Sequence, residues 1–214
     1  MPLDHERWIA LSVSSDYLSR FDGQVAVLVA ANLLSRMTPS VALTFPNTPM
    51  HAGLPWAGQS IHDVALAQMR AADPHADFAV RDLATGDYQF HLGRSGPRNI
   101  IHGTGWNAFL GAGPSPLPEE GELNCIGSSL AVIVAASQLF AHSFEVSQTS
   151  YIANAFNWRS EAVLNAPGYD ATRDLGNIWT VGVGSVGTAA PYFLSLATRN
   201  FHAHADRHGC GQAT

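Results

Sequence analysis

A short glycine-rich segment in the last fifth of the chain has the residue types and spacing of a phosphate-binding turn. Residues 177–181 are β-branched and aromatic and carry no charge, which is typical of a buried strand. A Gly-x-Gly-x-x-Gly segment follows directly, and an apolar run with helical spacing comes after it. In such a turn Gly182 lets the chain bend sharply, Gly184 lets the backbone approach a phosphate, and Gly187 lets the helix pack closely on the strand.

This turn predicts a nucleotide site. The first turn of the helix that follows offers free N–H groups and the positive end of the helix dipole to an anion. We therefore predict that the phosphates of a nucleotide bind at Gly182, Gly184, Ser185 and Gly187. Because a proline is tolerated only in the first turn of a helix, this helix should begin shortly before Pro191. The alternative is a glycine-rich turn of the same fold that binds no ligand.

An acidic residue about 20 positions beyond the last glycine normally binds the ribose of the nucleotide. Asp206 stands 19 positions after Gly187, but residues 204–209 do not have the composition of an apolar strand. One possible codon choice for residues 205–213, read one base later, gives Leu-Ile-Asp-Met-Asp-Val-Val-Lys, an apolar start followed by an acid. We therefore hypothesise that the residues from about Ala205 onward are out of frame, which the nucleotide sequence of the gene tests.

Composition limits the classes of function. The 214 residues are 46% hydrophobic, which is enough for a core, but only 13% are charged, which indicates that part of the surface is covered in an interface. The net charge is -6 and no basic patch is present, so we expect no binding to nucleic acid. There is no lysine, which excludes a Gly-Lys-Ser/Thr phosphate loop and a lysine Schiff base.

The cysteines and the apolar stretches indicate a cytoplasmic protein that does not contact a membrane. Cys125 and Cys210 are the only cysteines, too few for a disulfide framework. The N-terminal residues lack the order of a signal peptide, and the longest apolar stretch, residues 130–140, is too short to span a bilayer. Cys125 opens an apolar helix, and we predict that it is packed there rather than activated as a thiol.

Histidines and a cysteine cluster near the end of the chain. His202, His204, His208 and Cys210 are metal-ligand types at close spacing. A structural zinc site would need two flanking ligand pairs, which this cluster lacks. We therefore predict no metal site there.

The order of apolar segments predicts an α/β fold. Residues 8–13 and 41–45 have the pattern of buried strands, and residues 24–37 form a buried helix between them, with Asp22 as its N-cap. A strand, a helix and a strand in this order are typical of a Rossmann-like crossover. We further expect helices at residues 60–72 and 125–141, strands at 88–92 and 99–101, and loops at 46–59 and 111–122.

These elements define three parts of the chain. Residues 1–150 are predicted to form a Rossmann-like domain, and residues 151–176 a linker with some helix. Residues 177–214 are predicted to be the first strand–loop–helix unit of a second Rossmann-type domain, incomplete in this chain.

The chain resembles the ThiF-type, or ubiquitin-activating-enzyme-like, adenylyltransferases. Their adenylation domain begins with a strand, a Gly-x-Gly-x-x-Gly turn and a helix, to which residues 178–204 are similar. Residues 8–141 resemble the degenerate adenylation-like domain that some bacterial members carry before it. The resemblance implies that ATP and Mg²⁺ are used to adenylate the C-terminal glycine of a ubiquitin-like or sulfur-carrier protein, and that the protein forms a homo- or pseudo-dimer.

The family's site residues carry over only in part. Gly182, Gly184 and Gly187 match its ATP-phosphate loop, whereas its downstream arginine, lysine, magnesium aspartate and catalytic cysteine have no counterpart here. We therefore predict a truncated member that does not catalyse adenylation as this chain alone. Two alternatives stay open: an NAD(P)-binding oxidoreductase fragment, since the same turn serves that cofactor, and a catalytically silent dimerisation module.

Overall fold

The computed structural model divides into two compact units, Met1–Pro167 (unit 1) and Gly168–Thr214 (unit 2). It describes residues 8–82, 88–96, 99–118, 124–142, 150–161, 177–181 and 202–206. Within these ranges, no helix is both long enough and apolar enough to cross a membrane.

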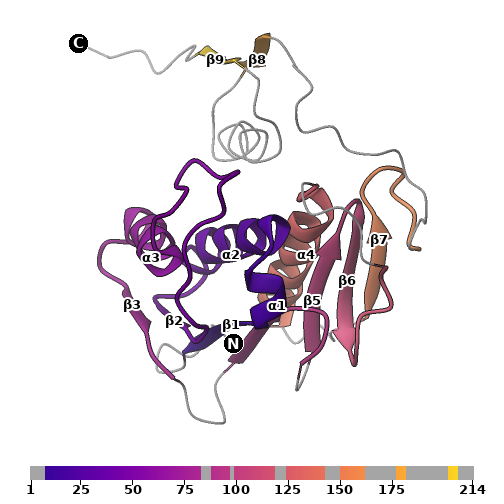
Figure 1. Ribbon diagram of the computed structural model, residues 1–214, viewed down its shortest axis with the longest axis horizontal. Helices are drawn as coiled ribbons and strands as arrows, with labels where there is room; N and C mark the ends of the chain where they lie inside the picture. The colour runs from indigo at the N-terminus through magenta and orange to yellow at the C-terminus, as the bar shows by residue number, and fades with distance from the viewer. Residues whose placement is uncertain are drawn as a thin grey trace. The chain divides into compact units, whose positions relative to one another are not determined.

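Unit 1 is a seven-stranded sheet with helices packed against it (Figure 1). Its elements in chain order are β1 (Ile9–Val13), α1 (Ser15–Leu18), α2 (Phe21–Leu34), β2 (Ser40–Leu43), α3 (Ile61–Ala72), β3 (Asp77–Val80), β4 (Tyr88–Leu92), β5 (Asn99–Thr104), β6 (Asn107–Ala112), α4 (Ile126–His142) and β7 (Tyr151–Asn154).

The strand order of this sheet is Rossmann-like and confirms the predicted α/β class. The order is β3-β2-β1-β4-β5-β6-β7. The first five strands in this order run parallel, whereas β6 pairs antiparallel with β5 and β7 pairs antiparallel with β6. The chain builds outward from β1 to β3 and then crosses to β4 on the other side of β1. The point between β1 and β4 is therefore the place where strand order reverses.

The helices α2, α3 and α4 lie side by side on one face of the sheet (Figure 1). All but two of the 14 residues of α2 are buried, because the helix is apolar all round and packs between the sheet and its two neighbours. The helix α4 approaches β5 so closely that a Cβ on Gly103 would overlap the backbone of Ser128. Glycine on β5 thus sets the distance between the sheet and α4.

The other face of the sheet carries a second apolar cluster. Side chains alternate along a strand, so Ile100 points away from the face on which Gly103 meets α4. Ile100 packs with Phe109 from β6 and with Leu117 from the loop that follows β6, and Ile152 of β7 lies against them. The sheet is therefore covered on both faces in this region.

Several predicted boundaries differ from the structure. The helix predicted at residues 24–37 begins at Phe21 and ends at Leu34. Asp22 is not its N-cap: Arg20 takes that position, and Asp22 lies in the first turn with its carboxylate bound by Arg20. Residue type alone favours Asp22 as the N-cap, and the ion pair with Arg20 overrides that preference.

Three strands of unit 1 were not predicted. The strand β3 is short and half exposed, and β6 begins within a hairpin and takes the first two residues of the predicted loop 111–122. Within the predicted linker, Tyr151–Asn154 forms β7 instead, because β6 offers a free backbone edge on which these residues pair. A buried hydrogen bond of 2.8 Å from the Asn154 amide to the Asn107 side chain holds the two strands in register.

The predicted loop 46–59 is confirmed, and one buried side chain fixes it. Gln24 in α2 donates from Nε2 to the carbonyl oxygens of Leu18 at 3.2 Å and Pro49 at 3.1 Å. Its Oε1 accepts from the backbone N–H of His51 at 2.7 Å. The loop is thereby tied to the first turns of α2.

The helix α3 begins where the sequence indicates, and its N-cap makes a testable contribution to stability. Ser60 Oγ accepts from Asp63 N–H at 3.3 Å and donates to Asn47 Oδ1 at 2.9 Å. We expect Ser60→Ala to lower the free energy of unfolding by about 1 kcal/mol, as measured by urea denaturation, because an N–H of the first turn loses its acceptor. The control Ser95→Ala removes an exposed serine hydroxyl and should change it by less than about 0.5 kcal/mol; an equal loss in both variants would contradict the capping role.

Unit 2 contains two described strands, β8 (Asn177–Val181) and β9 (His202–Asp206). They run parallel, with Val181 in register with Asp206. The strand predicted at residues 177–181 is confirmed.

Candidate functional site

The predicted phosphate turn lies between β8 and β9. Gly182, Gly184, Ser185 and Gly187 fall outside the described residues, so their role stays a prediction. Their flanks are defined: β8 ends at Val181, directly before the predicted turn, β9 begins at His202, and 20 residues lie between the two strands. Two parallel strands require a crossover connection, and its usual form is a helix. β8 and β9 are therefore a parallel pair, as the strands of a Rossmann-type unit are.

The structure corrects the interpretation of residues 204–209. We expected no strand there, yet residues 204–206 form the second half of β9. Histidine and alanine have weak strand preferences, and the ladder with β8 overrides them. Asp206 is the last residue of β9, the position at which the acidic residue of a Rossmann-type site is expected. The sequence as given thus places an acid at this position without a shift, while the out-of-frame hypothesis for the residues from about Ala205 stays a prediction; residues 207–214 lie outside the described ones.

The structure describes the histidine and cysteine cluster near the end of the chain only in part. His202 and His204 belong to β9, and His208 and Cys210 lie outside the described residues. Among the residues that the structure describes, no group of three or more His, Cys, Asp or Glu side chains is placed to hold a metal ion. No ligand for Mg²⁺ is therefore assigned within the residues that the structure describes.

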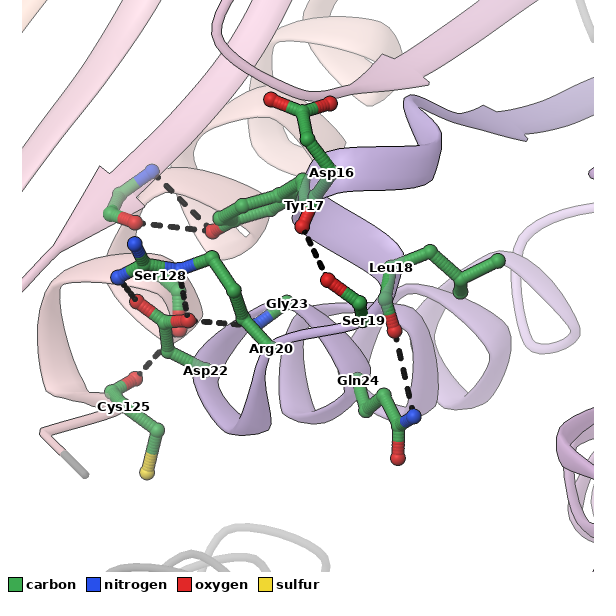
Figure 2. A network of polar contacts seen from close by, with 11 residues as sticks. Asp16, Tyr17, Leu18, Ser19, Arg20, Asp22, Gly23, Gln24, Cys125 and Ser128 are labelled. Carbon is green, nitrogen blue, oxygen red and sulfur yellow. Dashed lines mark hydrogen bonds and ion pairs between the residues drawn. The ribbon is translucent and has the colours of Figure 1, made fainter. Parts of the chain in front are cut away.

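Unit 1 offers a second place to look, at the carboxyl edge of its own sheet. In open α/β sheets, ligands bind outside the carboxyl ends of the strands where strand order reverses. Here that place lies beyond β1 and β4, and α1 and the start of α2 follow β1 directly. Figure 2 shows side chains from α1 and α2 gathered here with Cys125 and Ser128 at the start of α4.

Tyr17 from α1 occupies the centre of this group. Its side chain is 3% exposed, and its hydroxyl donates to the carbonyl oxygen of Gly103 on β5 at 2.9 Å. Its ring meets the imidazole of His102 edge to face, with 5.3 Å between the ring centroids. Burial, and then the negative charge of Asp22, raises the pKa of Tyr17 far above its ordinary value of 10.0. Tyr17 is therefore a neutral hydrogen-bond donor and does not serve as a base.

Arg20 and Asp22 form a buried ion pair beside Tyr17. Arg20 donates from Nε to Oδ1 and from Nη2 to Oδ2 of Asp22, both at 2.9 Å. The backbone N–H of Gly23 adds a third hydrogen bond to Oδ1 at 3.0 Å. Asp22 is fully buried, and the Arg20 side chain is 18% exposed. Two parallel hydrogen bonds between a guanidinium and a carboxylate are the strong form of an ion pair.

His102 lies on β5 at the same edge, where it is 5% exposed. Its Nδ1 shares a hydrogen bond of 2.8 Å with Ser115 Oγ, which also accepts from the N–H of Leu117. Burial, followed by the positive charges of Arg94 and Arg20, lowers the pKa of His102 from 6.5 to about 4, against the opposing effect of Asp16. His102 is thus a neutral core histidine at pH 7.

At the start of α4, two backbone N–H groups donate to acceptors of the chain itself. The N–H of Ile126 donates to Asn124 Oδ1 at 3.1 Å, and the N–H of Gly127 donates to the carbonyl oxygen of Gly105 at 2.8 Å. Cys125 is buried, and burial raises the pKa of its thiol from 9.0 to about 12. The prediction that Cys125 is packed rather than activated is confirmed.

The sequence alone does not indicate this edge of unit 1. Asp22 is predicted only as a cap, and Tyr17, Arg20 and His102 belong to no predicted site. The one local signal was the close spacing of Arg20 and Asp22, which on its own is compatible with an exposed pair. The bond from Tyr17 to Gly103 joins residues 86 positions apart, and no short-range pattern indicates it.

The comparisons with known proteins bear on the fold. The arrangement defines a Rossmann-like α/β protein, and a solved structure of Escherichia coli MccB, determined with selenomethionine MccA, is similar to it. The TM-score is 0.50 at 8% sequence identity, and the match covers 72% of this chain. This chain spans 62% of the length of that MccB chain. No protein-family model matches the chain. No curated protein matches it either.

Proposed function

We propose that this chain is the N-terminal portion of an ATP-dependent adenylyltransferase that activates the C-terminus of a ubiquitin-like or sulfur-carrier protein. The observation that carries the proposal is the parallel pair β8 and β9, joined by the residues that hold the Gly182–Gly187 turn. In this arrangement the backbone amides of the turn bind the phosphates of ATP. Asp206, at the carboxyl end of β9, binds the ribose hydroxyls.

The remaining features support this proposal without carrying it. The resemblance to ThiF-type proteins rests on the glycine turn, and the likeness to MccB, which was crystallised with MccA, concerns the fold. In this proposal unit 1 is a scaffold that binds no nucleotide, and a carrier polypeptide is the partner. Mg²⁺ would neutralise the charge on the ATP phosphates.

Thermal stabilisation by nucleotide tests the proposal. ATP with Mg²⁺ at about 100 times its Kd should raise the stability of the chain by about 2.7 kcal/mol, and NAD should not. Gly184→Asp should abolish the ATP effect, because a carboxylate in the turn repels the phosphates. The matched control is Ala57→Asp, which adds the same charge at an exposed position of the loop 46–59.

The other outcomes separate the alternatives. A shift with NAD but not ATP would favour the oxidoreductase fragment, and no shift with either would favour the silent dimerisation module. An ATP shift that persists in Gly184→Asp would place nucleotide binding elsewhere in the chain. ATP–pyrophosphate exchange by this chain alone is expected at background level, because the family's downstream catalytic residues have no counterpart in it.

A further inference from the structure

The region beyond the carboxyl ends of β1 and β4, where ligands bind in open α/β sheets, contains the chain's own groups and is called the crevice of unit 1 below. A nucleotide-binding turn after the first strand is tight and rich in glycine. Here the helical turn α1 stands between β1 and α2 instead. Its Tyr17 side chain reaches across the end of the sheet to Gly103 on β5, and it is almost completely buried (Figure 2). The ring of Tyr17 therefore fills the space beyond the ends of β1 and β5.

A negative charge is also already in place at this edge. The donors to Asp22 include a guanidinium fork from Arg20 and the backbone N–H of Gly23. Arginine forks and backbone amides are the groups with which proteins bind phosphate. The Asp22 carboxylate has the same sign and the same acceptor chemistry, and it is fully buried.

We propose that Asp22 is an internal ligand: its carboxylate takes the place of an external anion between Arg20 and Gly23 and closes the crevice of unit 1 to nucleotide phosphates. All the contacts that carry this inference lie in unit 1. It therefore stands or fails independently of nucleotide binding at the turn between β8 and β9.

Rescue by an external anion tests the proposal. Asp22→Ala empties the position and leaves the Arg20 guanidinium without its carboxylate, so the melting temperature should fall. Inorganic sulfate should then raise the melting temperature of this variant by about 4 °C more than it raises that of the wild type, relative to sodium chloride at equal ionic strength. The comparison with wild type removes the general stabilisation that sulfate gives to folded proteins.

Two further variants make the result decisive. In Asp22→Ala combined with Arg20→Gln, the guanidinium is gone, and the additional sulfate effect should disappear. Asp22→Ser retains an acceptor for the Gly23 N–H and decides the question if Asp22→Ala does not fold. A folded Asp22→Ala or Asp22→Ser with no more response to sulfate than the wild type would overturn the proposal.

Discussion

Gly23→Ala is expected to lower the free energy of unfolding by at least about 3 kcal/mol, a large part of the stability of a single domain. Gly23 lies in the first turn of α2, and the short helix α1 precedes α2 in the chain. A Cβ at this position would overlap the backbone carbonyl oxygen of Tyr17 and lie 2.7 Å from its carbonyl carbon. The overlap is with backbone, and the hydrogen bond from Tyr17 to Gly103 prevents α1 from moving away.

Urea denaturation of the wild type and of Gly23→Ala measures this loss in the free energy of unfolding. The matched control is Gly111→Ala, where the new Cβ would lie 3.0 Å from the end of the Phe109 ring and 3.2 Å from Ser150 Oγ. Those neighbours are the ends of side chains, so a loss of about 1 kcal/mol or less is expected there. A loss below about 0.5 kcal/mol in Gly23→Ala would show that α1 is not fixed against α2, and the closed crevice would lose its support.

The sequence indicates some elements of this fold and not others. Apolar runs in the sequence predict β1, α2, α3, β4 and α4, because the apolar pattern within a buried helix or strand indicates that element. The edge strands β3 and β7 lack such an apolar pattern, because they are only partly buried. β9 is the extreme case: its ladder with β8 decides its conformation.

The candidate sites divide in the same way. The glycine turn is a local pattern, because its chemistry comes from backbone amides that follow one another in the chain. The edge of unit 1 combines Tyr17 and Asp22 with Gly103 and Cys125 only after the sheet has formed. Asp22 could be found as a polar residue near the start of a helix, but its full burial cannot be read from its neighbours in the sequence.

His102 should make the stability of the chain depend on pH in a defined window. Its pKa is about 4 in the folded state against 6.5 for an exposed histidine. Between these values the unfolded chain binds a proton that the folded chain does not, so stability falls as the pH falls from about 6.5 towards 4. Between pH 7 and pH 5 this should lower the free energy of unfolding by about 2 kcal/mol.

The contribution is isolated by comparing pH profiles. His102→Gln should lose about 2 kcal/mol less than the wild type between pH 7 and pH 5, whatever its stability at pH 7. The control His75→Gln changes an exposed histidine and reports any general effect of removing one imidazole. Parallel profiles for the wild type and His102→Gln would mean that His102 accepts its proton in the folded state. The imidazole would then have to leave its contact with Tyr17 or have water beside it, and the crevice of unit 1 would be open rather than filled.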